Sequence, residues 1–277
     1  MAAEDSIARF FQQYGEQASQ ASDPCLKEAL ALLRDIAKEH ESQANTSSIP
    51  KQFIKEIEAV CRGIGHNFNG VLANIRGITE ITQMKAPNLP ETAQQALETI
   101  LSLSDRGEYS TQMIRYYGKA FNEQRQKLDL QVELPRMIND AKMTMEISFP
   151  LKQEATTPAM LSSNREMLEG CFAILIKNAL QAIHYGAPGI PEITIQLAAS
   201  TLLENGVCLS IQDNGEGMTE DTQARACDAF FTTRKAAEGV GLGLTIVKNF
   251  VTRQGGKLDI TSTAGSGTTV SLHLPRI

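Results

Sequence analysis

Apolar residues recur every three or four positions through the N-terminal part of the chain, which is the spacing of amphipathic helices. Residues 4–43 have this helical pattern, and the segment N-T-S-S-I-P at 45–50 interrupts it. A long helix is predicted from about Lys51 to Lys85, and the turn A-P-N-L-P at 86–90 ends it. A second long helix is predicted from there to about Phe121.

The apolar positions of these two helices define a surface that needs a partner. In the first helix they alternate four and three residues apart, the heptad spacing of a bundle or coiled coil: Ile57, Cys61, Ile64, Phe68, Val71, Ile75 and Ile78. In the second helix the candidate core residues are Leu97, Ile100, Leu103, Met113, Ile114 and Tyr117. Two long helices joined by a short turn form an antiparallel hairpin. We expect two copies of the hairpin to cover their apolar faces as a homodimeric four-helix bundle.

One histidine interrupts the first long helix in an unusual setting, the segment G-I-G-H-N-F-N-G at 63–70. Glycine costs a helix interior about 0.5–1 kcal/mol relative to alanine, so packing alone does not explain this composition. With Ile64 and Phe68 on the seam, His66 falls between them and is predicted to point to solvent. An exposed imidazole is a usable nucleophile near neutral pH. The alternative is a buried histidine in a loosely wound helix.

After about Leu128 the pattern changes to the alternation of half-buried strands. Strands are predicted at I-T-I-Q-L (193–197), V-C-L-S-I (207–211), K-L-D-I-T-S (257–262) and T-V-S-L-H-L (269–274). Two helices are predicted among them, from about Ser163 to Tyr185 and from about Leu244 to Gln254. This half is therefore predicted to be an α+β layer with helices against one face of a sheet.

Composition narrows the class of protein. The 277 residues are enough for two domains, and a net charge of −6 argues against a nucleic-acid-binding protein. No apolar run approaches the roughly 18 residues of a membrane span. The N-terminus carries acids where a signal peptide would carry basic residues, so we expect a cytoplasmic protein. The five cysteines are scattered without a C-x-x-C pair, which argues against a disulfide framework or a zinc site.

Four polar or glycine-rich motifs follow one another in the C-terminal half. L-I-K-N-A-L-Q-A-I places Asn178 in an apolar helix, where its amide is either satisfied in the core or functional. D-N-G-E-G-M at 213–218 is either a plain turn or a carboxylate that accepts an exocyclic amine. F-F-T-T-R-K at 230–235 precedes G-V-G-L-G-L at 239–244. Glycine-rich backbone that leads into a helix N-terminus can cradle phosphates, although this one is neither a Walker loop nor a Rossmann fingerprint.

Together with H-N-F-N at 66–69, these motifs resemble the H, N, G1, F and G2 boxes of two-component sensor histidine kinases, in the same order. The first box is most similar to the H-D-F-N-N subgroup, and G-S-G-T-T-V at 265–270 resembles the last glycine motif of the family. The resemblance covers about Phe53 to the C-terminus. It implies a dimerisation and histidine-phosphotransfer hairpin over residues 51–124 and a GHKL-type (Bergerat-type) ATP-binding α+β sandwich over residues 125–277. Residues 1–50 are then a helical extension of the dimer or a docking arm for another signalling protein.

The resemblance also implies the chemistry, with ATP and Mg²⁺ as cofactors. Asp213 would accept the adenine amino group, Asn178 would bind Mg²⁺ between the phosphates, and His66 would attack the γ-phosphorus. The phosphoryl group would then pass to an aspartate of a response-regulator receiver domain in a separate protein. Residues from about Thr219 to Glu238 would form a mobile lid, in which Arg234 or Lys235 could reach the γ-phosphate. The other implied nucleotide-binding residues are Gly215, Gly217, Met218, Phe231, Thr232, Thr233, Gly239, Gly241, Leu242, Gly243 and Thr268.

Three positions depart from the family pattern. Asn67 replaces the acid that usually follows the histidine, so it can orient the imidazole but cannot take its proton. Gly70 replaces a polar residue tied to phosphatase activity, and Ile174 occupies a position that is Glu in the ATPases of the superfamily. We therefore predict slow autophosphorylation, inefficient phosphatase activity and no water activation. The alternatives are a nucleotide-binding pseudokinase or adaptor that acts through its bundle, and a superfamily ATPase or serine kinase.

Overall fold

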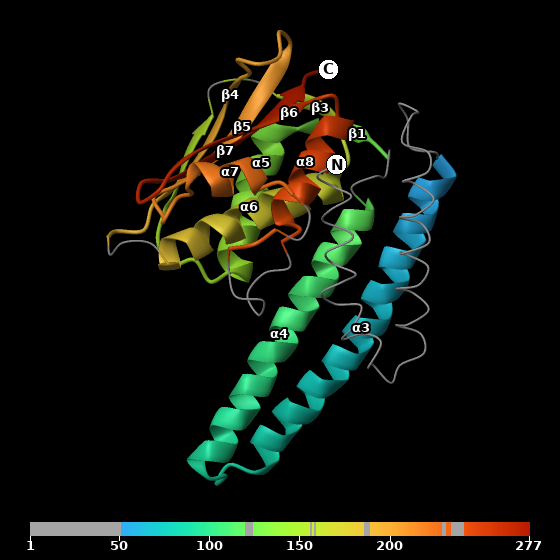
Figure 1. Ribbon diagram of the computed structural model, residues 1–277, viewed down its shortest axis with the longest axis vertical. Helices are drawn as coiled ribbons and strands as arrows, with labels where there is room; N and C mark the ends of the chain where they lie inside the picture. The colour runs from blue at the N-terminus through green and yellow to red at the C-terminus, as the bar shows by residue number, and fades with distance from the viewer. Residues whose placement is uncertain are drawn as a thin grey trace. The chain divides into compact units, whose positions relative to one another are not determined.

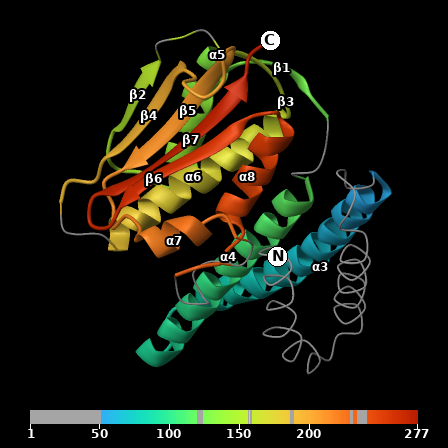
Figure 2. The same ribbon diagram turned by 45° about the horizontal axis from the view of Figure 1, so that its top comes forward.

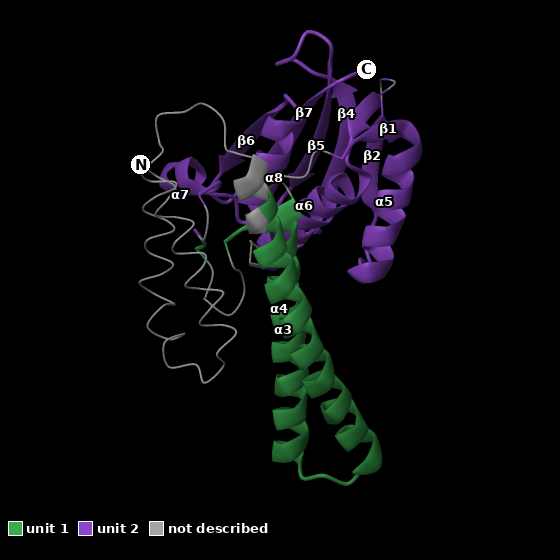
Figure 3. Ribbon diagram, turned by 90° about the vertical axis from the view of Figure 1, so that its right-hand side faces the viewer, with its two compact units in different colours: residues 1–119, 232–242 green, residues 120–231, 243–277 purple. Residues whose placement is uncertain are grey.

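The computed structural model describes residues 51–119, 124–155, 157, 159–185, 189–228, 231–233 and 241–277. The chain divides into two compact units, residues 1–119 with 232–242 and residues 120–231 with 243–277 (Figure 3). The helical pattern predicted over residues 4–43 lies outside the described residues, as does Gly239.

The described helices of the first unit form the predicted hairpin (Figure 1). Helix α3 spans Lys51–Lys85 and helix α4 spans Glu91–Lys119. Glu91 lies in the first turn of α4, and Lys85 and Lys119 lie in the last turns of their helices, where each charge complements the helix dipole. Both helices thus begin and end close to the positions expected from the sequence.

The predicted heptad seam does not join the two helices within one chain. Of its described members Cys61 is buried, but Phe68, Val71, Ile75 and Ile78 are 38%, 57%, 40% and 68% exposed. On α4, Met113 is buried, whereas the core candidates Ile100 and Leu103 are among the exposed large apolar residues. A single hairpin therefore leaves these positions as an exposed apolar face, which is the surface that a second copy was predicted from the sequence to cover.

The helices meet instead along a neighbouring stripe of polar and small residues. The Thr111 hydroxyl hydrogen-bonds the Asn69 side-chain oxygen, and Arg76 forms an ion pair with Asp105. Glycines allow the helix backbones to approach, because a Cβ on Gly107 would lie 2.8 Å from a Leu72 methyl carbon. A Cβ on Gly118 would likewise lie 2.7 Å from the Cβ of Cys61. Pairing within the hairpin therefore combines close contacts at small residues, such as Gly107 with Leu72 and Gly118 with Cys61, with polar bonds.

The second unit is built on a five-stranded sheet with the order β2-β4-β5-β7-β6. Strands β2 and β4 are parallel and the other neighbours are antiparallel. The strands span Leu151–Ala155 (β2), Ile193–Ala199 (β4), Gly206–Asp213 (β5), Lys257–Thr263 (β6) and Gly267–Pro275 (β7). A separate antiparallel pair joins β1 (Gln126–Asp129) to β3 (Met160–Ser163).

Helices α6 (Arg165–Tyr185) and α8 (Gly243–Arg253) cover one face of this sheet (Figure 2). Buried side chains from both layers form the core, among them Phe172, Ile176, Ile195, Leu209 and Phe250. The α+β layer, its four predicted strands and its two predicted helices are therefore confirmed. Helices α5 (Leu130–Thr144) and α7 (Glu220–Arg225), and strands β1, β2 and β3, were not predicted.

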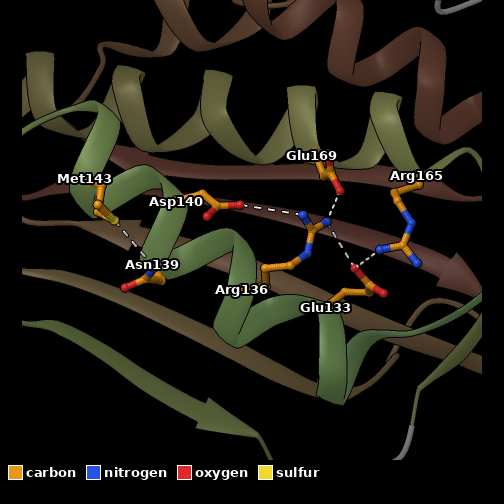
Figure 4. Close-up of polar contacts among 7 residues, drawn as sticks. All are labelled: Glu133, Arg136, Asn139, Asp140, Met143, Arg165 and Glu169. Carbon is orange, nitrogen blue, oxygen red and sulfur yellow. Dashed lines mark hydrogen bonds and ion pairs between the residues drawn. The ribbon is translucent and has the colours of Figure 1, made fainter.

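Helix α5 is fixed to α6 by a group of charged side chains (Figure 4). The buried carboxylate of Glu133 receives both Arg136, at 3.2 Å, and Arg165. Arg136 also pairs with Glu169 of α6, and with Asp140 at 3.6 Å. Arg136 of α5 pairs with Glu169 of α6, and Arg165 of α6 pairs with Glu133 of α5, so the group fixes the orientation of α5 against α6.

Candidate functional site

The first predicted site residue, Asp213, ends strand β5 and is buried. Its Oδ1 accepts a hydrogen bond of 2.9 Å from the backbone N–H of Gly215. Burial raises the pKa of Asp213 above its ordinary value, and the backbone hydrogen bonds from Gly215 and Thr268 oppose the rise. A buried carboxylate with remaining acceptor capacity can receive an amine that reaches it from an apolar pocket.

The glycines that follow Asp213 press the chain against its neighbours. A Cβ on Gly215 would lie 2.6 Å from the carbonyl oxygen of Ala182 in α6, and Glu216 N–H donates to that same oxygen at 3.0 Å. Gly217 has a φ of +64° and a Cβ there would overlap the carbonyl oxygen of Thr263. Only glycine satisfies both positions, so the loop is shaped by close backbone approach rather than being a plain turn.

Asn178 and Gly243 are brought together from distant parts of the sequence. A Cβ on Gly243, the first residue of α8, would lie 3.7 Å and 3.9 Å from the two terminal atoms of the Asn178 side chain. The Asn178 amide is half-buried, and no described residue hydrogen-bonds it. The amide oxygen is therefore available beside a helix N-terminus, where free backbone N–H groups favour anions.

The two halves of the site lie on one face of α6. Asn178 and Ala182 are four residues apart, so their Cβ atoms are about 5–6 Å apart on the same side of the helix. Gly243 lies against the first residue and Gly215 against the second. The structure thus places the predicted adenine end and the predicted phosphate end of the site along a single turn of α6.

Sequence reasoning named Thr268 but missed the residues that position it. Ser262 of β6 accepts a hydrogen bond from Met218 N–H at 2.8 Å, and its hydroxyl lies 2.9 Å from that of Thr268. Gly267 has a φ of +98° and lies so close to Asp213 that a Cβ would overlap its carbonyl oxygen. The G-S-G-T-T-V motif contained the signal for Gly267, whereas Ser262 belongs to an ordinary strand pattern and carried none.

The remaining predicted residues follow α7. Phe231 lies under the guanidinium of Arg225, which is 4.2 Å from the ring centroid, so its ring contacts a cation of α7. Thr232 and Thr233 are exposed. Gly241 has a φ of +69° and Leu242 is buried. Arg234, Lys235 and Gly239 lie outside the described residues.

In the first unit, His66 and Asn67 are both exposed on α3. One turn further along, Asn69 is engaged by Thr111 of α4, as described above. Gly70 has open space where a Cβ would be, and so does Gly63. Gly65 differs, because a Cβ there would overlap the side chain of Arg115. Only one of the three glycines around the histidine is therefore required by packing.

The residues of the site fit a magnesium ion only in company with a nucleotide. Among the described residues there is no group of three or more His, Cys, Asp or Glu side chains that could hold a metal ion. A single amide oxygen, from Asn178, is a typical partial ligand for Mg²⁺, which is commonly completed by water and phosphate oxygens.

Comparison with known protein families covers the segment that contains this site. Residues 163–277 match the family described as histidine kinase-, DNA gyrase B-, and HSP90-like ATPases. The C-terminal part of the chain is thus similar to this family. The matched segment runs from the end of β3 to the last residue and so contains Asn178, Asp213 and Thr268.

Relatives that extend over the helical hairpin are sensor kinases. The chain is 26% identical over 245 residues to the C4-dicarboxylate transport sensor protein DctB of Pseudomonas aeruginosa, which covers 87% of this chain and 39% of DctB. It is 26% identical over 228 residues to sensor histidine kinase ZraS of Escherichia coli (81% of this chain, 47% of ZraS). It is 25% identical over 273 residues to sensor histidine kinase YcbM of Bacillus subtilis (92% and 82%).

Among solved structures, full-length ShkA in complex with AMPPNP is similar in fold, with a TM-score of 0.59 and 17% identity over 78% of this chain and 45% of ShkA. The chain is thus similar in sequence to sensor histidine kinases such as ZraS and YcbM, and its C-terminal part is similar to the histidine kinase-, DNA gyrase B-, and HSP90-like ATPases. It spans less than half the length of the DctB and ZraS proteins that it matches. Within the described residues no helix is long and apolar enough to cross a membrane.

Proposed function

We propose that the chain is an ATP-dependent histidine autokinase that phosphorylates His66 and passes the phosphoryl group to an aspartate of a separate response-regulator receiver domain. The observation that carries this proposal is the alignment along α6, where Gly215 lies against Ala182 and Gly243 lies against Asn178. A nucleotide bound along this turn has its base beside the Asp213 carboxylate and its phosphates beside the N-terminus of α8. His66 is the exposed acceptor in the hairpin.

The residues of the site have distinct roles in binding ATP. Asp213 accepts the adenine amino group in its ionised form, which the Gly215 N–H stabilises. The amide oxygen of Asn178 would hold Mg²⁺ beside the phosphates, and the ion would supply neutralisation of their charge. Free backbone N–H groups at the start of α8 receive phosphate oxygens.

In the transfer step, a ring nitrogen of His66 attacks the γ-phosphorus. The new N–P bond forms while the bond from the γ-phosphorus to the bridging oxygen breaks, and ADP leaves with that oxygen. The imidazole then loses its N–H proton to solvent, because the amide of Asn67 cannot accept it. We therefore expect Asn67→Asp to raise the autophosphorylation rate. An unchanged or lower rate would show that Asn67 is not the limiting substitution.

Ile174 argues against hydrolysis of ATP by water. Its side chain is buried one turn before Asn178, and its Cγ2 would lie 3.0 Å from a Cβ on Gly243. The position that could activate water beside the phosphates thus holds an aliphatic group with no proton acceptor. This favours transfer of the γ-phosphoryl group to the imidazole of His66, on another part of the molecule, over its hydrolysis by water.

Two features bear on the dephosphorylation reaction. Gly70 has no side chain to orient a water, and the amide oxygen of Asn69 is engaged by the Thr111 hydroxyl. The same hydroxyl also lies 2.9 Å from the backbone carbonyl oxygen of Glu108, so it can donate to either oxygen. We therefore propose that the chain acts mainly as a kinase and has little phosphatase activity.

The exposed apolar face of the hairpin supports a homodimer. Phe68, Val71, Ile75 and Ile78 lie on α3, and Leu103 adds to the exposed apolar surface on α4. Two copies that cover these faces would complete a four-helix bundle. The cytoplasmic location and the role of residues 1–50 in binding another signalling protein stay predictions. The boundaries at residues 50 and 124 also stay predictions.

Incubation of the full chain with γ-labelled ATP tests the proposal. Wild type should gain acid-labile, base-stable label, and His66→Ala and Asp213→Asn should gain none, for different reasons. His66→Ala should still bind ATP, whereas Asp213→Asn should not. ATP binding by wild type without any label would contradict the kinase and favour the pseudokinase or adaptor.

A further inference from the structure

The register of the hairpin shows which residue of α4 lies level with the candidate phosphoacceptor. Gly65 lies against Arg115, Asn69 against Thr111, and Leu72 against Gly107. Each step forward on α3 is thus matched by a step backward on α4. His66 follows Gly65 by one residue, so Arg115 is the α4 residue at its level.

The two side chains also leave the hairpin on the same side. In a pair of antiparallel right-handed helices, a side chain that follows a contact residue is rotated away from the contact line. The rotation is toward the same side of the pair for both helices. His66 is turned by about 100° from Gly65, and Arg115 is turned by about 40° from Thr111. Both residues are exposed. The stem of Arg115 packs over Gly65, the residue before His66, so closely that a Cβ on Gly65 would overlap its Cγ and Cδ.

The charge of Arg115 is not neutralised within the described part of the chain. No described residue forms an ion pair or a hydrogen bond with its guanidinium. Arg62, one turn before His66 on α3, offers a contrast. Its Nη2 lies 2.9 Å from Oε1 of Glu58, so that cation already has a carboxylate partner. Of these two arginines, Arg115 is the one whose guanidinium has no carboxylate partner among the described residues.

We propose that Arg115 binds the phosphoryl group once it is on His66 and so stabilises the phosphorylated state of the kinase. This inference rests on the proposed function for the identity of the acceptor. A phosphoryl group carries close to two negative charges near neutral pH, and a guanidinium offers planar donors that match its oxygens. An unpaired arginine beside the acceptor meets this need without first breaking another ion pair. Gly65 is the small residue that lets the stem of Arg115 lie close enough.

The first test measures the equilibrium between ATP with unmodified chain and ADP with phosphorylated chain. At a fixed ratio of ATP to ADP, Arg115→Gln should lower the phosphorylated fraction about fivefold, and Arg115→Lys should keep most of it. Arg62→Gln is the matched control and should change the fraction by less than about twofold. Raising the salt to about 1 M should shrink the difference between wild type and Arg115→Gln, because exposed charges are screened.

The second test does not depend on the ATP site. Phosphoramidate phosphorylates imidazoles directly, and phosphorus NMR then follows the titration of the phosphoryl group, with His66→Ala identifying its signal. Arg115→Gln should raise the second pKa of the phosphoryl group by about 0.7, the equivalent of fivefold, and Arg62→Gln should leave it nearly unchanged.

The outcomes separate this inference from the proposed function. If ATP labels wild type normally and Arg115→Gln changes neither the equilibrium nor the titration, the role of Arg115 is refuted and the kinase stands. If ATP labels nothing but Arg115→Gln shifts the titration, the kinase is refuted and the binding role stands. Equal effects of Arg62→Gln and Arg115→Gln would show a general charge effect and would also refute the specific role.

Discussion

Replacing Gly215 by alanine tests the alignment of the site along α6. A Cβ on Gly215 would lie 2.6 Å from the carbonyl oxygen and 2.7 Å from the Cβ of Ala182. These neighbours are the backbone and the short side chain of Ala182 in the last turn of α6, so they cannot turn aside as a long side chain could. The strand end must move away from α6 instead.

The cost follows from what that movement disrupts. Overpacking of a well-packed site costs about 1–3 kcal/mol. The hydrogen bonds from Gly215 N–H to Asp213, at 2.9 Å, and from Glu216 N–H to Ala182, at 3.0 Å, would also be strained. We expect Gly215→Ala to lower the free energy of unfolding by about 2–3 kcal/mol, and to weaken ATP binding at least tenfold.

Urea unfolding followed by circular dichroism measures the first quantity, and titration calorimetry with ATP and Mg²⁺ measures the second. Gly255→Ala is the control for lost stability alone. Gly255 has a φ of +79° but open space for a Cβ, so alanine there costs about 1–2 kcal/mol of backbone strain without touching the site. Gly215→Ala that binds ATP as well as Gly255→Ala does would refute the reasoning.

Three further predictions follow from burial and charge. Burial raises the pKa of Asp213 above 3.8, so the contribution of this group to the free energy of unfolding is fully present below that pH and is lost as the pH rises through the raised pKa. Asp213→Asn should therefore gain stability relative to wild type as the pH rises from 3.8 toward neutrality. A stability difference that is independent of pH in urea unfolding would contradict this. Burial raises the pKa of Cys61 to about 11. Iodoacetamide should therefore modify Cys61 in the folded chain about 100-fold more slowly than it modifies a thiol of pKa 9.0. Equal modification rates in native and denatured protein would disprove the burial of Cys61. Glu133→Ala should cost about 1–3 kcal/mol because it removes the buried carboxylate that Arg136 and Arg165 share, whereas Asp140→Ala, at the exposed end of the same group, should cost less than about 1 kcal/mol in the same assay.

The helices and strands that could be predicted are those in which one periodicity dominates. Helices α3 and α6 carry long apolar patterns, and β5 and β7 alternate, so local sequence determines them. Helix α5 was missed although its buried residues Leu134, Ile138 and Ala141 recur at helical spacing. Pro135 lies inside it, and proline in a helix interior usually argues against the assignment.

Site residues could be predicted where a local motif requires an unusual backbone conformation. They could not be predicted where contacts between distant segments determine which residues meet. The φ of Gly217 and the close approach of Gly215 explain why D-N-G-E-G-M carries glycines at those positions. The contact between Gly243 and Asn178 joins residues far apart in sequence, and no local pattern contains it. The contacts between α3 and α4 were not predicted, because polar pairs such as Asn69 with Thr111 lie outside the apolar heptad pattern.

The most direct test of the central claim is the location of the phosphoryl group after incubation with ATP. The chain has four histidines, at positions 40, 66, 184 and 273, and mass spectrometry of peptides kept at neutral or basic pH can distinguish them. The account predicts phosphate on His66 alone, its loss on mild acid treatment, and its absence from Asn178→Ala. Phosphate on another histidine, acid-stable phosphate on a hydroxyl side chain, or ATP binding with no phosphate on any histidine would contradict it.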